Sequence, residues 1–490
     1  MSRRPWVLVL LPLLALAVLA AGCGQGGQAG KIRITTKSKE ARQAYLVARD
    51  LAEGLRAQNA IEHYQKAVAL DSAFALAELG LANTSPTAKE AFEHLHKAVR
   101  LTGKVSEGER LLILATEAGF NGNAAVQKQQ LTRLVAAFPA DERAQLNLGA
   151  YLYGVQDYEG AMACLTKATQ LAPGFPPPYN LLGYANRELG HYPEARQAFE
   201  KYITLIPNDP NPYDSDAELL LKMGRFSESI GPYRKALSFD SLFISSRIGV
   251  ATDQLYMGEP KDADATLARL YGLARNDGER RGALFAMAVV AADGGRLADA
   301  LAQVDRELGV AEQTGDIASM SGDLQNRGTI LVEMGRYDEA KPAFERSLKL
   351  LQDSDLAADL KENAGFIQHY DNVKVALGRR QLEIAKAEAA EFQKGVAAKE
   401  NPGLTKLAHE LAGMVALAGK DYPTAIAELK QASQQDPYNL YRLALAFQAS
   451  GDREKARDYC AQAAHFYPLP SLNYAFIRAK AGKALAGIKG

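Results

Sequence analysis

The sequence is poor in the residues that build disulfide frameworks and metal cages. It has three cysteines, Cys23, Cys164 and Cys460, and one tryptophan, Trp6. Three scattered cysteines are too few for either kind of framework. The charges also balance, because 57 basic and 57 acidic residues leave a formal net charge of zero. Nothing in this balance favours nucleic acid as a partner, and we expect no metal and no cofactor.

Motifs that carry catalysis are also missing. His409 and Glu410 begin like a zinc-protease helix, but Gly413 stands where the second histidine must be. A run of glycines between Gly22 and Gly27 follows an apolar segment rather than a strand, which excludes a phosphate-binding loop. The sequence therefore predicts a protein that is not an enzyme.

What is present at the amino terminus is an export signal. Arg3 and Arg4 precede an apolar run over residues 7–21. This run is shorter than the roughly 20 residues of a spanning helix and ends in small residues, as secretory signals do. We therefore expect residues 1–22 to be a signal peptide. Trp6 lies within it, so the mature chain would have no tryptophan.

The end of this signal has a further pattern. Leu19-Ala20-Ala21-Gly22-Cys23 resembles the lipobox of bacterial lipoproteins, with leucine one position further from the cysteine than is usual. The resemblance implies that Cys23 is acylated and becomes the first mature residue, anchored to the membrane. Gly24 after the cysteine favours the outer membrane, facing the periplasm. The alternatives are an ordinary signal peptide cleaved nearby and an uncleaved anchor. Residues 23–37 are expected to form the lipidated cysteine and a flexible linker, because residues 24–30 are rich in glycine.

The rest of the chain repeats one spacing of small and large residues. A small residue is followed after four positions by a large one, after three more usually by alanine, and after five by proline. Because proline does not continue a helix, it marks the end of each unit. The sets with this spacing are Ala161, Leu165, Ala168 and Pro173; Ala195, Phe199, Tyr202 and Pro207; Ala425, Leu429, Ala432 and Pro437; and Ala456, Cys460, Ala463 and Pro468.

This pattern resembles the tetratricopeptide repeat, a unit of about 34 residues with two antiparallel helices. The resemblance implies an all-α, right-handed superhelical solenoid of about twelve helix pairs between residues 38 and 490. It is strongest over residues 143–241. We expect an N-terminal array over residues 38–273, degraded central units over 274–355 and a C-terminal array over 356–490.

The resemblance also implies where partners bind. In this family the first helices of the units line a concave groove. Between residues 143 and 222, the helical period places several polar side chains on the face of these helices that lines the groove. We expect a groove for an extended peptide, with asparagine amides on its backbone and arginine on its carboxylates. The candidate residues are Arg143, Leu146, Asn147, Tyr153, Asn180, Tyr184, Arg187, Asp214, Glu218 and Lys222.

Together these features predict a membrane-anchored scaffold that binds protein or peptide partners in the bacterial cell envelope, in assembly or secretion. One alternative is a glycan-binding uptake lipoprotein, although a mature chain without tryptophan lacks the usual sugar platform. Another is a sensory or regulatory module that works with a separate effector.

Overall fold

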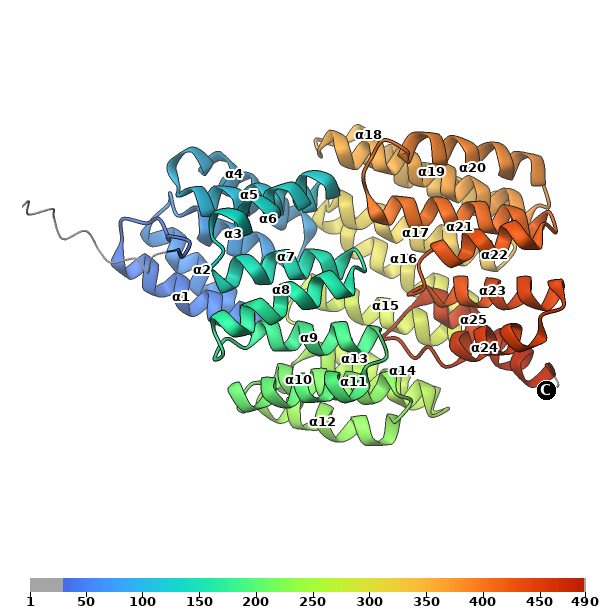
Figure 1. Ribbon diagram of the computed structural model, residues 1–490, viewed down its shortest axis with the longest axis horizontal. Helices are drawn as coiled ribbons and strands as arrows, with labels where there is room; N and C mark the ends of the chain where they lie inside the picture. Colours follow the sequence, from blue (N-terminus) through green and yellow to red (C-terminus); the bar gives the residue numbers. More distant parts are fainter. Residues whose placement is uncertain (1–29, 489–490) are drawn as a thin grey trace, which may run out of the picture.

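The computed structural model describes residues 30–488, and its regular structure is helical throughout this range (Figure 1). The predicted signal peptide and Cys23 lie outside the described residues. Within residues 30–488 no helix is both long enough and apolar enough to cross a membrane. One short 3-10 turn, Thr102–Lys104, lies among the α-helices. The α-helices are α1 (Lys39–Glu53), α2 (Ala57–Leu70), α3 (Ala75–Thr84), α4 (Ala88–Arg100), α5 (Glu107–Phe120), α6 (Ala124–Ala137), α7 (Glu142–Gly154), α8 (Tyr158–Leu171), α9 (Pro177–Glu188), α10 (Tyr192–Leu205), α11 (Pro210–Lys222), α12 (Phe226–Phe239), α13 (Ile244–Tyr256), α14 (Pro260–Leu273), α15 (Asp277–Asp293), α16 (Leu297–Thr314), α17 (Ile317–Glu333), α18 (Tyr337–Asp353), α19 (Ala358–Gly378), α20 (Leu382–Val396), α21 (Pro402–Ala418), α22 (Tyr422–Gln431), α23 (Pro437–Ser450), α24 (Arg453–Ala464) and α25 (Leu472–Gly487).

Successive helices pack as pairs, from α1 with α2 to α23 with α24, and α25 follows the last pair. The prediction of an all-α repeat array with about twelve helix pairs is therefore confirmed. The pairs are numbered 1 to 12 in chain order from α1 and α2, and the two members of a pair are its first and second helix.

Small residues allow the helices of a pair to approach closely. A Cβ atom at Gly183 of α9 would lie 2.3 Å from the ring of Phe199 on α10. Ala195 and Phe199 are both fully buried at this contact. Because close-packed interiors leave no space for an added carbon, these positions require a small residue opposite a large one. This is the physical basis of the repeated spacing in the sequence.

The central units are regular in structure, although their sequence spacing is irregular. The helices α15, α16, α17 and α18 contain 17, 18, 17 and 17 residues, whereas α7 and α8 contain 13 and 14. Longer helices lengthen the distance along the chain from one pair to the next, whereas the contact within a pair, as between Gly328 and Phe344, is kept. Residues 277–353 thus form two helix pairs that are longer than the pair of α7 and α8.

Part of the predicted flexible linker is bound to the helical array. Residues 31–37, which we call the strap, lie extended across the beginnings of several first helices. The backbone amide of Ile32 donates to Asp141 Oδ2 at 2.8 Å, and that of Thr35 donates to Glu109 Oε1 at 2.7 Å. A flexible linker would not place its amides on buried carboxylates. Glycines are confined to residues 24–30, and the strap itself is rich in β-branched residues, which favour extended backbone.

Distant pairs contact one another because the array curls back on itself. The amide of Ala88 donates to Asp316 Oδ2 at 2.8 Å, and Asn123 Nδ2 donates to Asp359 Oδ2 at 2.9 Å. Both contacts join pairs that are about seven units apart. In Figure 1 the early helices in blue and green accordingly lie beside the late helices in yellow and red. One turn of the array thus packs on the next.

The carboxyl-terminal segment closes this second turn. Helix α25 packs against α15, and one core cluster joins residues of α15–α18 to residues of α24 and α25. Arg478 of α25 pairs with Asp293 at the end of α15, with its Nε atom 2.7 Å from Asp293 Oδ2. The Tyr467 ring lies 4.9 Å from the ring of Phe226, centroid to centroid. Pairs 6 and 8 are therefore held to the end of the chain.

Candidate functional site

The predicted groove residues come from three consecutive first helices. Helix α7 carries Arg143, Asn147 and Tyr153; α9 carries Asn180, Tyr184 and Arg187; and α11 carries Glu218. The spacing of the α9 residues, at i, i+4 and i+7, places them on one face of that helix. The structure does bring the α9 and α11 residues together, mostly by direct contacts with one another.

Arg187 is the centre of a buried ionic network. Its Nη1 atom lies 3.1 Å from Glu218 Oε2, and its Nη2 atom lies 2.7 Å from Glu188 Oε1. Its guanidinium also lies 4.6 Å from the centroid of the Tyr184 ring. Burial raises the pKa of Glu218 above its ordinary value, while the positive charge of Arg187 opposes this shift. Two carboxylates thus share one guanidinium, which leaves Arg187 without spare positive charge for a ligand.

Asn180 does not face an open groove. It is 9% exposed, and its side-chain oxygen accepts a hydrogen bond from Ser215 Oγ at 2.9 Å. The Tyr184 hydroxyl donates to the same Ser215 oxygen at 3.2 Å. Asn180 therefore lies between α9 and α11 and links neighbouring pairs. Its amide oxygen thus joins two adjacent first helices, and its role in peptide binding stays a prediction.

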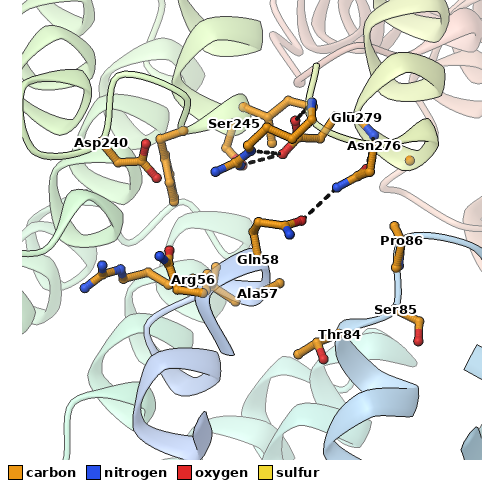
Figure 2. Close-up of a pocket in the computed structure, with 16 residues that line it drawn as sticks. Arg56, Ala57, Gln58, Thr84, Ser85, Pro86, Asp240, Ser245, Asn276 and Glu279 are labelled. Carbon is orange, nitrogen blue, oxygen red and sulfur yellow. Dashed lines mark hydrogen bonds and ion pairs between the residues drawn. The ribbon is translucent and has the colours of Figure 1, made fainter. Parts of the chain in front are cut away.

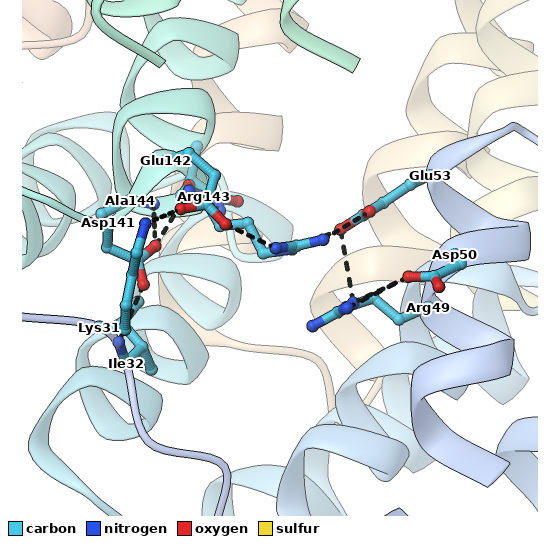
Figure 3. Close-up of polar contacts among 10 residues, drawn as sticks. Lys31, Ile32, Arg49, Asp50, Glu53, Asp141, Glu142, Arg143 and Ala144 are labelled. Carbon is cyan, nitrogen blue, oxygen red and sulfur yellow. Dashed lines mark hydrogen bonds and ion pairs between the residues drawn. The ribbon is translucent and has the colours of Figure 1, made fainter. Parts of the chain in front are cut away.

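The α7 residues also have partners within the chain. Arg143 reaches α1, where its Nε atom lies 2.8 Å from Glu53 Oε1 and its Nη2 atom lies 2.9 Å from Glu53 Oε2 (Figure 3). Its guanidinium lies 4.4 Å from the Phe175 ring centroid. Asn147 Nδ2 donates to the Arg143 carbonyl oxygen at 2.7 Å. A two-point ion pair of this kind holds the first and fourth pairs together.

Four of the predicted residues, Tyr153, Arg187, Glu218 and Lys222, line a pocket of about 280 Å³, which we call the tyrosine pocket. One wall comes from the carboxyl-terminal halves of the first helices of pairs 4 to 6 and the residues that follow them. The other wall comes from the end of the chain. The first wall contains Tyr153, Tyr158, Arg187, Glu188, Glu218, Leu221 and Lys222, and the second contains Gln435, Phe466, Tyr467, Pro468 and Leu469.

Lys222 is the cation of this pocket that lacks a counter-ion. Its ammonium lies 3.6 Å from the centroid of the Phe466 ring. It forms no ion pair within 4 Å among residues 30–488, and burial lowers its pKa to about 8. Burial likewise raises the pKa of Tyr153 to about 12, so its hydroxyl stays protonated at neutral pH. The pocket therefore offers an unpaired ammonium beside aromatic rings, a combination that suits a carboxylate with apolar neighbours.

Sequence reasoning missed the second wall of this pocket. Phe466 and Tyr467 lie more than 200 residues after α11, so no local period connects them to it. The signal that was available is the composition of residues 466–470, an apolar connection between helices where polar turn residues are usual. Tyr467 also has a positive φ of 46°, a conformation that an aromatic residue adopts only under tertiary constraint.

A second pocket, of about 260 Å³, lies where the first pair meets the second turn (Figure 2). Its polar residues are paired across the contact: Asn276 Nδ2 donates to Gln58 Oε1 at 2.9 Å. Arg275, beside Asn276, pairs with Glu279, with its Nε atom 2.8 Å from Glu279 Oε1. The hydrogen bond between Asn276 and Gln58 thus joins the first pair to the second turn of the array.

Comparison with known families agrees with this architecture. Models of the tetratricopeptide repeat match residues 142–175, 176–209, 324–352 and 438–469. The first two stretches begin at α7 and α9, and the third lies in the central units. The chain is a tetratricopeptide repeat protein. Proteins with this fold are in general scaffolds for protein–protein interactions rather than catalysts, and the chain shares that architecture.

Solved structures with similar folds include several repeat proteins. One chain in the structure of the APC/C hetero-tetramer Cut9–Hcn1 is 15% identical to this chain. The match covers 92% of this chain and 76% of that chain, with a TM-score of 0.43. A tetratricopeptide repeat protein from Parabacteroides merdae is 14% identical, covers 53% of this chain and 99% of its own, and has a TM-score of 0.35. YrrB, described as having an unusual peptide-binding site, is 18% identical. The match covers 37% of this chain and 91% of YrrB, with a TM-score of 0.25. No curated protein sequence matches the chain significantly.

Proposed function

We propose that this protein is a membrane-anchored scaffold of the bacterial cell envelope that binds an extended peptide segment of a partner protein at the tyrosine pocket. The observation that carries the proposal is the unpaired ammonium of Lys222 among aromatic rings. A peptide that places a carboxylate near Lys222 and an apolar side chain on Phe466 or Tyr467 would satisfy both features. The pocket lies at the first helices, where repeat arrays offer their binding surface.

The electrostatics favour Lys222 over Arg187 as the contact for such a carboxylate. Arg187 is already shared by Glu188 and Glu218, at 2.7 Å and 3.1 Å. The Lys222 ammonium is partly buried against the Phe466 ring without an ion pair, and this burial lowers its pKa to about 8. A carboxylate that enters the pocket would restore the favourable interaction and raise the Lys222 pKa again. Binding should therefore weaken as the pH rises through about 8.

The test begins with a library of synthetic peptides screened against the purified mature chain. The tightest peptide is then titrated against Lys222→Met, which keeps the apolar stem and removes the charge. We expect its Kd to rise by about tenfold or more, since a charge-assisted contact contributes about 1.5 to 3 kcal/mol. Lys201→Met is the matched control, because Lys201 also lies over an aromatic ring, that of Tyr179 at 6.0 Å, but on an exposed surface. Equal affinity of both variants would refute the proposed pocket.

The membrane anchor is tested separately. The proposal rests on the lipobox-like residues that end at Cys23 and on the apolar run before them. Cys23→Ser should move the protein from the membrane fraction to the soluble fraction and abolish labelling with a radioactive fatty acid, because a stable anchor requires covalent acyl chains. Density-gradient separation of the wild-type membranes then tests the outer-membrane location. Membrane retention of the Cys23→Ser protein would contradict lipidation.

A sugar is the competing ligand that the pocket itself suggests. Tyr153, Tyr158, Phe466 and Tyr467 give it four aromatic rings, and sugars bind to aromatic faces. Envelope oligosaccharides therefore belong in the same titrations as competitors. Displacement of the bound peptide by an oligosaccharide, with no loss of oligosaccharide affinity in Lys222→Met, would favour the glycan-binding alternative over the peptide.

A further inference from the structure

The strap is held as an extended peptide is held by a receptor. Each of three carboxylates accepts hydrogen bonds from it. Asp141 Oδ2 accepts from the Ile32 amide at 2.8 Å. Glu109 Oε1 accepts from the Thr35 amide at 2.7 Å, and Asp71 Oδ2 accepts from the Thr36 hydroxyl at 2.6 Å.

These three carboxylates belong to successive units of the array. Asp71 precedes α3, Glu109 lies in the first turn of α5, and Asp141 is the N-cap of α7. The strap also accepts a hydrogen bond, because Ser106 Oγ donates to the Arg33 carbonyl oxygen at 2.8 Å. The connection between pairs 1 and 2, which begins at Asp71, the C-cap of α2, and pairs 3 and 4 thus each supply one carboxylate to the same extended segment. We call this surface the acidic edge.

Apolar side chains of the strap occupy fitted positions between these carboxylates. A Cβ atom at Gly108 would lie 2.9 Å from the Ile32 side chain, so the glycine at the start of α5 makes room for it. Ile32 packs with the core cluster of pairs 3 and 4, which includes Phe138. Ile34 packs with the core cluster of pairs 1 and 2. Arg33 and Lys37 are exposed, whereas Ile32 and Ile34 are partly buried against these clusters.

Strap and edge also have opposite charges. Lys31, Arg33 and Lys37 are the charged residues of the strap, and all three are basic. The residues that receive it include three carboxylates of the edge and Glu142, which pairs with Lys31 (Figure 3). Glu109 is fully buried and Asp141 is 5% exposed, so their charges act in a low-dielectric setting. The edge is therefore complementary to a basic segment.

The same recognition occurs elsewhere in the chain, between the two turns of the array. Asp141 Oδ1 caps its own helix by accepting from the Ala144 amide at 2.9 Å, which leaves Oδ2 for Ile32. Asp316, the N-cap of α17, likewise uses Oδ1 for its own helix and Oδ2 for the amide of Ala88 at 2.8 Å. The N-cap aspartates of α7 and α17 thus each accept a backbone amide from another segment of the chain. At pairs 2 to 4, where the array has no preceding turn, the strap is that chain.

We propose that the acidic edge of α3, α5 and α7 is a second peptide-binding surface, specific for extended partner segments that alternate basic and β-branched residues, and that the strap is its resident occupant. The surface is separate from the tyrosine pocket, and its existence does not depend on the function proposed for that pocket. A partner segment binds here by displacing the strap. The strap lies between the lipidation site predicted at Cys23 and α1, so this exchange would release the tether from the array.

The experiment uses the full mature chain and a fluorescent synthetic peptide with the sequence of residues 30–38. Ile32→Asp with Ile34→Asp loosens the strap of the chain without changing the edge. We expect this variant to bind the peptide at least about tenfold more tightly than wild type, because an attached strap competes at a high effective concentration. A peptide with the same two aspartates should not bind. Circular dichroism and thermal melting verify that the loosened chain remains folded.

A matched pair of edge variants tests the specificity. Asp71→Asn in the loosened chain should weaken peptide binding about fivefold or more. It removes the negative charge of the carboxylate that accepts hydrogen bonds from the Thr36 hydroxyl and the Lys37 backbone amide. Asp240→Asn is the control: Asp240 has the same local structure, as the C-cap of α12 with its Oδ1 accepting from the amide two residues later, and it does not contact the strap. Equal effects of the two substitutions overturn the proposal. So does a folded, loosened chain that binds no peptide, or one that dimerises by exchanging straps.

Discussion

Two glycines of α17 allow the packing rule of the array to be tested within a single helix. A Cβ atom at Gly328 would lie 2.3 Å from the ring of Phe344, which is 1% exposed. A Cβ atom at Gly322 would meet no atom within 4 Å, and this residue is exposed. Both residues lie in the interior of the helix Ile317–Glu333. Alanine at the two positions should therefore have opposite effects on stability.

The magnitudes follow from two terms. Glycine to alanine in a helix interior stabilises by about 1 kcal/mol, and this term is the same at both positions. At Gly328 an overpacking cost of about 1 to 3 kcal/mol acts against it. A contact of 2.3 Å with a buried ring places the cost near the upper end of that range. We expect Gly322→Ala to stabilise by about 1 kcal/mol and Gly328→Ala to destabilise by about 2 kcal/mol.

The assay must resolve local stability, because a repeat array does not unfold as one cooperative unit. Native-state hydrogen exchange of the α17 and α18 amides gives the free energy of opening for this pair. Phe344→Leu in the Gly328→Ala background should recover part of the loss, since it removes the atoms that the new Cβ meets. Equal stabilisation by both alanines would refute the packing argument, and so would an equal loss of protection in distant pairs such as α1 and α2.

Two further predictions concern pH and the contact between the turns. Asp253 is fully buried, and burial raises its pKa to about 7. The stability that it contributes is therefore complete below pH 4 and is lost as the pH rises through about 7. Asp253→Asn should abolish this dependence and stabilise pair 7 by up to about 4 kcal/mol at pH 8, measured as hydrogen exchange against pH. Tyr467→Ala should cost about 2 kcal/mol and increase exchange in α13 and α25, because the ring packs on Tyr256 of α13 and Tyr474 of α25. Exchange in α1 to α4 should not change. Unchanged exchange in α25 would show that the turns are held by other contacts.

The candidate site was predictable only in part. The helical period identified Tyr153, Arg187 and Glu218, and all three line the tyrosine pocket. The same period gave no indication that Asn180 is buried against Ser215, because position on a helix face does not distinguish an open surface from the contact with the next unit. Lys222 was among the candidates, but only the contacts around it show that it lacks a counter-ion.

The helix pairs and their number follow from local spacing in the sequence. Alternation of small and large residues, as at Gly183 and Phe199, acts between helices that are neighbours along the chain, so a local pattern records it. The stacking of pairs that are distant along the chain follows only from the folded array. A small rotation from each pair to the next accumulates until Ala88 meets Asp316, and no local spacing encodes that sum. For the same reason the strap, which reads as a linker, proved to be bound: its partners Asp71, Glu109 and Asp141 share one edge only after pairs 2 to 4 have stacked.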